Sequence, residues 1–362
     1  MPDIILIGGG VIGLSIAYEL AGQGASVRIL DQGPLGQESS WAGAGMVSPG
    51  DPAKARSLDA KLRAESFVRW PDWSARLRDE TGIDNGFSLC GAIELSPTHS
   101  RNELIAAANE WRLDGINVEE LDSRQLHQLE PNLHPELDHA IHMPQAGQVR
   151  NPRHLKALIA ACLARGVQLS PGTPVIGFEG QGRRTTSVRT VEGTISADQF
   201  VVCSGAWSKS VLSLANFNVE VEPLRGQIVL LNTPRLPIRR VLEVGPRYLV
   251  PRSDGRILIG STEEHAGFDK SNTAEAIADL IRFATELVPT LKTARFERCW
   301  SGLRPMSRTG LPYLGRVPHS ENLFVAAGHF RLGLTLSPIT AVLLRQMLLN
   351  QPLTIEWPAI QS

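Results

Sequence analysis

Three glycines close to the N-terminus have the spacing of a phosphate-binding turn. Gly8, Gly10 and Gly13 form the pattern G-x-G-x-x-G between an apolar strand at residues 4–7 and a helical stretch. Such a turn lets the backbone approach a diphosphate, which the unpaired N–H groups and the dipole of the helix then stabilise. Asp31 follows the second strand, close to the ~20 residues after the turn at which a carboxylate bonds a ribose hydroxyl. The pattern therefore predicts a dinucleotide site, and it leaves open whether the nucleotide is NAD or FAD.

Two further glycine turns occur later in the chain, one of them close to its C-terminal end. Gly43 to Gly45 lie in a loop rich in small residues, and Gly328 to Gly333 lead directly into an apolar helix. Between them an apolar strand ends at Ser204-Gly205, where small side chains let the backbone approach a ligand. A simple NAD site is built mostly from one half of a chain, whereas FAD is larger and extends further through its domain. The distribution of these turns therefore favours FAD.

Composition restricts the class of protein. The chain has 362 residues, 42% of them hydrophobic and 20% charged, with a formal net charge of −1. This length suggests two domains, and the charge argues against a general polyanion-binding surface. Neither a membrane-spanning run nor a secretory leader is visible, so we expect a cytoplasmic protein that binds neither nucleic acid nor membrane. The four cysteines are scattered without a C-x-x-C pair, so neither a metal site nor a disulfide framework is predicted.

The elements that must position these turns alternate between strands and helices. Helical periodicity predicts helices at 14–24, 58–80, 101–114, 151–165, 273–287 and 334–350. Strand-like segments lie at 4–7, 27–30, 92–95, 167–169, 173–178, 187–191, 199–203, 227–231, 256–259 and 322–328. The predicted fold class is α/β, a discontinuous Rossmann-like FAD-binding domain with an inserted mixed or antiparallel sheet that forms the substrate domain. We assign 1–85, 140–218 and 300–362 to the FAD-binding domain, and 86–139 and 219–299 to the substrate-binding domain.

Several ordered motifs along the chain belong together in one family. They are the opening fingerprint, Ser40-Trp41-Ala42-Gly43-Ala44-Gly45-Met46, Pro223-Leu224-Arg225-Gly226-Gln227, Tyr248-Leu249-Val250-Pro251-Arg252, Gly302-Leu303-Arg304-Pro305, Pro312-Tyr313-Leu314-Gly315 and Gly328-His329-Phe330-Arg331-Leu332-Gly333. On these residues the chain resembles the FAD-dependent D-amino-acid and amine oxidase family, and within it the glycine oxidases of the thiamine-biosynthesis type. The resemblance covers essentially the whole chain. The motifs around Arg304 and Arg331 are the most specific for the glycine oxidases over their relatives.

The resemblance implies an enzyme that oxidises glycine and related small amines such as sarcosine and small D-amino acids. In that family a hydride passes from the substrate Cα to flavin N5 of FAD, which we expect to be held non-covalently. Oxygen reoxidises the flavin and is itself reduced to hydrogen peroxide. The imine is hydrolysed to glyoxylate and ammonia or serves thiamine biosynthesis. Relatives are commonly tetramers, so we expect a homo-oligomer. Three alternatives stay open, namely an FAD-dependent dehydrogenase with a quinone or carrier as acceptor, an NAD-dependent dehydrogenase, and a non-enzymatic flavoprotein partner.

Two arginines and a tyrosine carry the expected chemistry. A guanidinium binds a carboxylate bidentately, and by resemblance Arg304 does so for the substrate, with the hydroxyl of Tyr248 as second partner. Arg331 matches an arginine of the family that interacts with substrate or flavin, and a plain ion pair is its alternative interpretation. No side-chain base is nominated. The expected cofactor contacts are Gly8, Gly10, Val11, Ile12, Gly13, Asp31, Gln32, Ser39, Ser40, Ala44, Gly45, Met46, Val175, Ser204, Gly205, Trp207, Gly302, Arg304, His329, Phe330, Arg331, Leu332, Gly333, Leu334 and Thr335.

Two positions depart from the family pattern. Glu263 stands two residues after Ser261, where relatives have an apolar pocket residue, and Pro246 stands where some relatives have histidine. A carboxylate at position 263 either tightens binding of the substrate amine or points to solvent. The preferred substrate among glycine, sarcosine and larger amino acids therefore stays open. His329 is interpreted either as a buried histidine with its hydrogen bonds satisfied or as a neighbour of the flavin.

Overall fold

The N-terminal fingerprint forms a parallel βαβ unit in the computed structural model, which describes residues 1–95 and 101–360. β1 (Ile4–Ile7) leads through the glycine turn into α1 (Val11–Ala21), which returns to β2 (Val27–Leu30). β1 pairs in parallel with β2 on one side and with β12 (Gln199–Val202) on the other. All four residues of β1 are buried, because helices and strands cover both faces of this sheet. The helix begins at Val11, earlier than predicted, directly after Gly10, so that Gly13 lies within its first turn.

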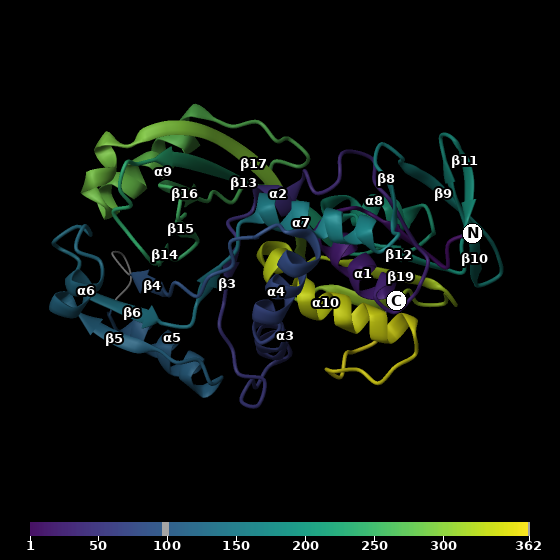
Figure 1. Ribbon diagram of the computed structural model, residues 1–362, viewed down its shortest axis with the longest axis horizontal. Helices are drawn as coiled ribbons and strands as arrows, with labels where there is room; N and C mark the ends of the chain where they lie inside the picture. The colour runs from purple at the N-terminus through teal and green to yellow at the C-terminus, as the bar shows by residue number, and fades with distance from the viewer. Residues whose placement is uncertain (96–100, 361–362) are drawn as a thin grey trace.

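The sheet that contains this unit has six strands in the order β18-β19-β12-β1-β2-β8. The further strands are β18 (Tyr313–Arg316), β19 (Leu323–Ala327) and β8 (Gln168–Ser170), and only the pair of β18 and β19 is antiparallel. On one face pack α1, α7 (Asn151–Ala164) and α10 (Gly333–Leu348). The other face is covered by α8 (Ser208–Ser213) and a small sheet of β9 (Val175–Gln181), β10 (Arg184–Thr190) and β11 (Gly193–Ser196). Figure 1 shows this layered region on the right, with both chain termini.

A second sheet has eight strands in the order β17-β13-β16-β15-β14-β4-β6-β5. Their bounds are β4 (Ala92–Leu95), β5 (Glu119–Asp122), β6 (His139–Met143), β13 (Val221–Asn232), β14 (Val241–Val244), β15 (Arg247–Pro251), β16 (Arg256–Gly260) and β17 (Arg295–Ser307). Every neighbouring pair is antiparallel except β14 with β4. The amphipathic helix α9 (Ala274–Leu287) packs Leu280, Ala284 and Leu287 against one face. The opposite face contributes to the cavity described below.

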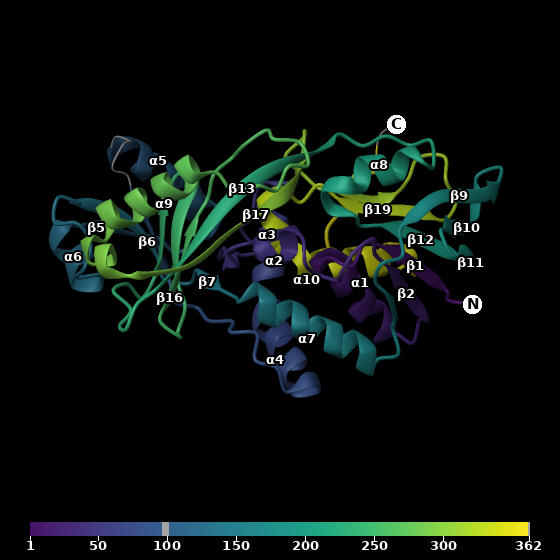
Figure 2. The same ribbon diagram turned by 90° about the horizontal axis from the view of Figure 1, so that it is seen from above.

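Two long strands connect the regions. β13 and β17 pair along almost their whole length and run from the eight-stranded sheet to the centre of the molecule, as Figures 1 and 2 show. Arg304 lies near the C-terminal end of β17, in this central part. β17 crosses the expected domain boundary at 299/300, and β6 begins just before the one at 139/140. The division into domains by residue range therefore stays a proposal, and the mixed sheets confirm the predicted fold class.

The single helix predicted over residues 58–80 is wrong. The structure has two helices instead, α3 (Leu58–Phe67) and α4 (Trp70–Thr81). Pro71 lies in the first turn of α4, where its missing N–H costs nothing. In a continuous helix the ring of Pro71 would clash with the carbonyl of Phe67, so the chain bends between α3 and α4.

The remaining α-helices and strands of the described residues are α2 (Ser39–Ala42), α5 (Arg101–Leu113), α6 (Ser123–Leu129), β3 (Met46–Val47) and β7 (Gly147–Gln148).

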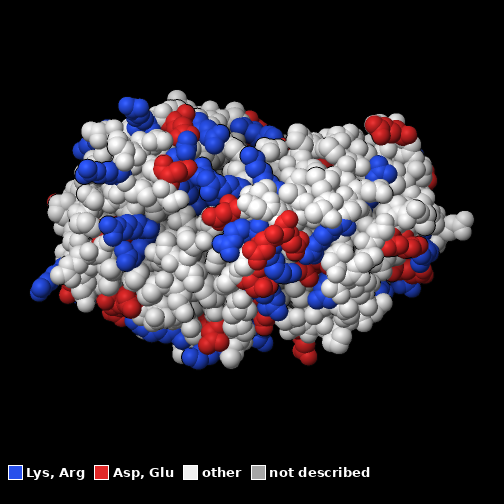
Figure 3. Space-filling view, in the orientation of Figure 1, with Lys and Arg blue, Asp and Glu red and all other residues white. Residues whose placement is uncertain are grey.

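The charged side chains are mixed on the face that Figure 3 shows, where lysines and arginines alternate with aspartates and glutamates along the centre. This mixture agrees with the formal net charge of −1. Within residues 1–95 and 101–360, no helix combines the length and the apolar character that crossing a membrane would require.

Candidate active site

A cavity of about 630 Å³ lies where the two sheets meet. It is lined by all three glycine turns and by the side chains of Tyr248 and Arg304. Every site residue predicted from the sequence lines this cavity except Gly13. A Cβ at Gly13 would lie 2.0 Å from the carbonyl oxygen of Gly8, so this glycine serves the close packing of helix on turn. The structure therefore brings together residues that lie more than three hundred positions apart in the chain, from Gly8 to Thr335.

The N-terminal glycine turn forms one end of the cavity. Gly8 has φ +117°, and a Cβ there would lie 2.4 Å from the carbonyl oxygen of Cys203 on the neighbouring strand end. The N–H of Val11 donates to Ser40 Oγ at 2.9 Å. The remaining N–H groups of the first turn of α1 have no acceptor within the helix, so they point their partial positive charge toward the cavity. This end suits an anionic group.

Asp31 has a structural function that the sequence did not indicate. Its Oδ2 accepts from the N–H of Gly9 at 2.6 Å, and its Oδ1 accepts from the N–H of Gly33 at 2.8 Å. Burial raises the pKa of this carboxyl above its usual value. Asp31 thus fixes the glycine turn while lining the cavity, and each carboxylate oxygen has a further lone pair for a ligand hydroxyl.

Two further glycines in the cavity wall allow close packing of the backbone behind it. A Cβ at Gly45 would lie 2.0 Å from the carbonyl oxygen of Val149, and one at Gly302 would lie 2.6 Å from the Cβ of Ala42. Glycines therefore form walls that no larger residue could build. The segment from Gly328 to Thr335 lines the same space and begins α10, whose N-cap has no side-chain hydrogen bond. The positive end of this helix dipole lies at the cavity wall.

The wall of the cavity that the eight-stranded sheet forms carries the predicted carboxylate-binding pair, Tyr248 on β15 and Arg304 on β17. The Nη1 of Arg304 donates to the carbonyl oxygen of Thr262 at 3.0 Å, and its Nη2 donates to Ser261 Oγ. The remaining N–H groups of the guanidinium can meet a ligand in the cavity. Two glycines make this arrangement possible. A Cβ at Gly226 would lie 2.4 Å from the guanidinium nitrogens, and one at Gly260 would lie 2.5 Å from Tyr248 Oη.

Arg331 and Glu263 form an ion pair with each other. Arg331 lies in the turn before α10 and lines the cavity, whereas Glu263 follows β16 and stands outside the cavity lining. Their side chains are 42% and 32% exposed. Glu263 is thus held in an ion pair and does not line the cavity. The contact that the structure shows for Arg331 is this ion pair, which was one of the two interpretations of that residue.

Two carboxylates near Tyr248 were missed by the sequence reasoning. Glu243 pairs with Tyr248 on β15 and with Glu94 on β4, so all three side chains lie on the cavity face of the sheet. Glu243 lines the cavity. Burial raises the pKa of Glu243, and burial together with the charge of Glu243 raises the pKa of Glu94 to about 7. The sequence could have indicated these two carboxylates, because each is an acidic residue inside an apolar strand segment, Ala92–Leu95 or Val241–Val244.

His329 is a buried histidine in the wall of the cavity. It lines the cavity, is 3% exposed, and shares a hydrogen bond of 3.1 Å between its Nε2 and Thr340 Oγ1 of α10. Burial lowers the pKa of this imidazole to about 3, so the ring is neutral near pH 7. Its contribution to the cavity is therefore steric and polar, without a charge.

Comparisons with known proteins give a consistent result. The family described as FAD dependent oxidoreductase matches residues 3–347. The chain is 38% identical over 347 residues to the glycine oxidase of Pseudomonas putida, covering 96% of this chain and 94% of the relative. It is 33% identical to the bifunctional protein ThiO/ThiG of Trichormus variabilis, covering 96% of this chain and 53% of that protein. The crystal structure of glycine oxidase from Geobacillus kaustophilus matches with a TM-score of 0.94 at 32% identity, covering 98% of this chain and 96% of that one.

Proposed function

The chain belongs to the FAD dependent oxidoreductase family, and on that premise we propose that it oxidises glycine and related small amines. The family answers the question that the N-terminal fingerprint left open, because the nucleotide is FAD. It also sets aside the NAD-dependent dehydrogenase as an alternative. The enzyme is an oxidoreductase acting on CH–NH groups, as its glycine oxidase relatives are.

The observation that carries the proposal is that Arg304 and Tyr248, on strands of the eight-stranded sheet, line the same cavity as the N-terminal glycine turn of the six-stranded sheet. A bidentate guanidinium and a phenol hydroxyl suit one small carboxylate. The Gly8 turn and the start of α1 would hold the diphosphate, Asp31 the adenosine ribose, and the segments Gly43–Met46 and Gly328–Thr335 the flavin.

The residues contribute mainly by orienting the substrate. Arg304 and Tyr248 would fix the carboxylate and thereby present Cα and the amine to the middle of the cavity. The chemistry that bound FAD would supply here is acceptance of a hydride from that carbon and reduction of oxygen to hydrogen peroxide. The N-terminus of α10 stabilises negative charge that develops beside it. The product imine hydrolyses to glyoxylate and ammonia or serves thiamine biosynthesis.

A peroxide-coupled assay on the yellow protein tests the proposal. Glycine, sarcosine, D-alanine and D-proline are compared as substrates, and glyoxylate is measured beside peroxide. We expect Arg304→Ala to lose several kcal/mol of transition-state stabilisation, on the order of the cost of an unpaired charge-assisted contact. Arg295→Ala is the matched control, because Arg295 is exposed on the same strand.

Each competing function predicts a different result of this assay. Reduction of a quinone or dye without peroxide would indicate a carrier-dependent dehydrogenase. Full turnover by the Arg304 variant would refute the role of this residue, and flavin binding without turnover of any amine would favour a non-enzymatic partner. A homo-oligomer, with a tetramer as first candidate, is part of the proposal, and light scattering of the holoenzyme tests it.

A further inference from the structure

The motif at residues 223–227 holds two polar side chains that the candidate active site leaves unused. Arg225 and Gln227 lie on β13, where they are 6% and 0% exposed. Because side chains alternate along a strand, both point away from the face that carries Gly226 and the cavity. Burying an arginine is costly unless its donors are paired, so its partners show what it holds.

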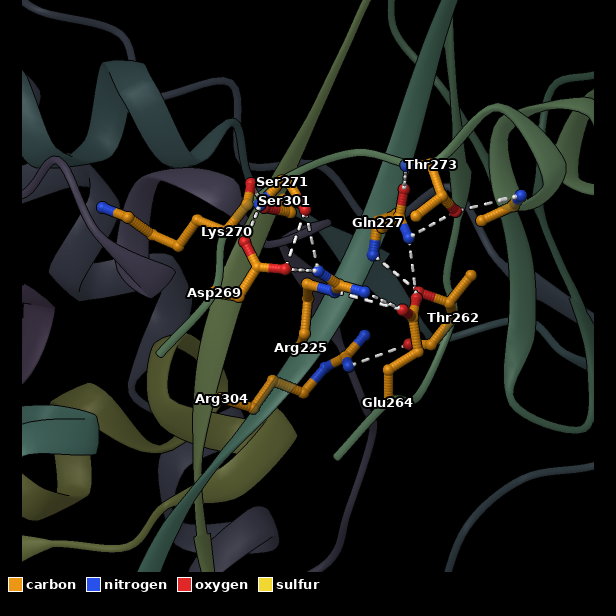
Figure 4. A network of polar contacts seen from close by, with 11 residues as sticks. Arg225, Gln227, Thr262, Glu264, Asp269, Lys270, Ser271, Thr273, Ser301 and Arg304 are labelled. Carbon is orange, nitrogen blue, oxygen red and sulfur yellow. Dashed lines mark hydrogen bonds and ion pairs between the residues drawn. The ribbon is translucent and has the colours of Figure 1, made fainter. Parts of the chain in front are cut away.

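Both side chains bind residues 261–271, which follow β16 and which we call the strap. Arg225 Nε donates to Glu264 Oε2 at 3.1 Å, and Nη1 donates to Asp269 Oδ2 at 2.6 Å. The backbones of Arg225 and Glu264 also exchange two hydrogen bonds of 2.9 and 3.0 Å. The Nε2 of Gln227 donates to Glu264 Oε1 at 2.8 Å, and its backbone N–H donates to Thr262 Oγ1 at 2.9 Å. Figure 4 shows Arg225 between the two carboxylates, with Arg304 beside the strap.

The other side of the strap holds the guanidinium that faces the cavity. Arg304 donates to the carbonyl oxygen of Thr262 and to the hydroxyl of Ser261, both strap residues. The next strap residue, Glu263, pairs with Arg331. Both arginines predicted to meet the substrate are therefore oriented by the same short segment, and Arg225 anchors that segment from behind.

We propose that Arg225 is a positioning residue for substrate binding, which it achieves by clamping the strap that orients the Arg304 guanidinium. The inference rests on the proposed function, because it assumes that Arg304 holds the substrate carboxylate. A bidentate contact requires the guanidinium plane to be fixed before the ligand arrives. The strap fixes the guanidinium of Arg304 through two hydrogen bonds. Arg225 in turn fixes the strap through its ion pairs with Glu264 and Asp269.

A matched pair of variants separates positioning from stability. Arg225→Gln removes the clamp. Arg256→Gln removes an arginine that also bridges two carboxylates, Asp254 and Glu297, at the end of β16 away from the strap. The measurements are kcat and KM for glycine, the Kd of acetate from the change in flavin absorbance, the FAD content and the thermal midpoint. Acetate is the probe because it has the carboxylate of glycine without the amine.

The expected result is a selective loss of carboxylate binding. Arg225→Gln should raise the KM for glycine and the Kd of acetate about tenfold or more, since small misplacements of binding groups have effects of this size. Its FAD content should stay near that of the wild type, because neither Arg225 nor its partners Glu264 and Asp269 lines the cavity. Arg256→Gln should also lower the thermal midpoint, by less than Arg225→Gln because Arg256 is the more exposed arginine, and should leave KM and Kd within about twofold. Arg225→Lys, which keeps the charge without the planar fork, should fall between Arg225→Gln and the wild type.

Unchanged KM and Kd in Arg225→Gln, or equal changes in both glutamine variants, would overturn the inference. If Arg225→Gln does not fold, Glu264→Gln and Asp269→Asn take its place. They should raise the Kd of acetate in graded fashion, more at Glu264, which is the more buried partner. A wild-type protein that neither oxidises glycine nor binds acetate would instead refute the proposed function.

Discussion

The pair of carboxylates beside Tyr248 leads to a stability prediction with a definite sign. Glu94 faces Glu243 across parallel strands, and its pKa rises from 4.5 to about 7. The folded protein therefore binds more protons here than the unfolded chain does between those two values. Stability falls as the pH rises through this window and levels off above it, because the folded carboxyl must then ionise in a buried position and beside Glu243. Glu94→Gln removes the ionisation and keeps the shape of the side chain.

The magnitude follows from the two pKa values. Proton linkage gives a destabilisation by Glu94 of about 3 kcal/mol at pH 8 and about 1 kcal/mol at pH 5. The amide of glutamine needs hydrogen-bond partners of its own, which offsets about 1 kcal/mol. We therefore expect Glu94→Gln to be about 2 kcal/mol more stable than the wild type at pH 8 and nearly equal to it at pH 5. For a chain of this length the gain at pH 8 corresponds to roughly 3 °C in the thermal midpoint.

The assay is thermal unfolding of the FAD-loaded protein at pH 5, 6, 7 and 8, followed by tryptophan fluorescence. Glu297→Gln is a control of opposite sign on the same sheet, because the hydrogen bond from Arg256 lowers the pKa of Glu297. That variant should lose stability by nearly the same amount at pH 5 and at pH 8, because a carboxyl with a lowered pKa contributes its full stability above about 4.5. A Glu94→Gln protein that is no more stable at pH 8, or whose gain does not depend on pH, would refute the argument that these carboxylates share an unfavourable environment.

Three further expectations concern other parts of the cavity. Gly226→Ala places a Cβ against the guanidinium of Arg304, so we expect a folded protein whose KM for glycine rises about tenfold or more. An unchanged KM in steady-state kinetics would contradict this expectation. Glu263→Gln removes a half-exposed partner of Arg331 and should cost under about 1 kcal/mol in urea unfolding, less still in high salt. A loss of several kcal/mol would show that the pair is far better shielded than its exposure indicates. Burial raises the pKa of the Cys203 thiol, so a disulfide reagent should label this residue only after unfolding, as peptide mapping can check.

Features that depend on local backbone requirements were predictable from the sequence. The glycine turns were found because a helix N-terminus that approaches a ligand permits few residue types, and the structure brings these turns to one cavity. Arg304 and Tyr248 could be nominated because their motifs resemble those of a known family. Features that depend on pairing between distant segments could not be found. The proximity of Glu94 to Glu243 needs the parallel register of β4 with β14, and the contact of Glu263 with Arg331 needs the placement of α10.

The break between α3 and α4 is a different kind of failure. The apolar periodicity of residues 58–80 is compatible with one helix, and Pro71 was visible in the sequence. A proline is tolerated in the first turn of a helix and disrupts its interior, so its position relative to a helix start decides the outcome. Periodicity does not report that start, since both helices present apolar residues to the same core.

The position of β1 in the middle of its sheet sets an order on the synthesis of the protein. β1 leaves the ribosome before the other strands of its sheet, but its neighbour β12 begins at Gln199 and the next strand, β19, begins at Leu323. The N-terminal strand and helix must therefore wait, with apolar surface exposed, until most of the chain has been made. The cavity closes only when the start of α10 arrives. A nascent or truncated chain would thus display the dinucleotide fingerprint without a finished site, and cofactor capture becomes one of the last events in the maturation of the protein.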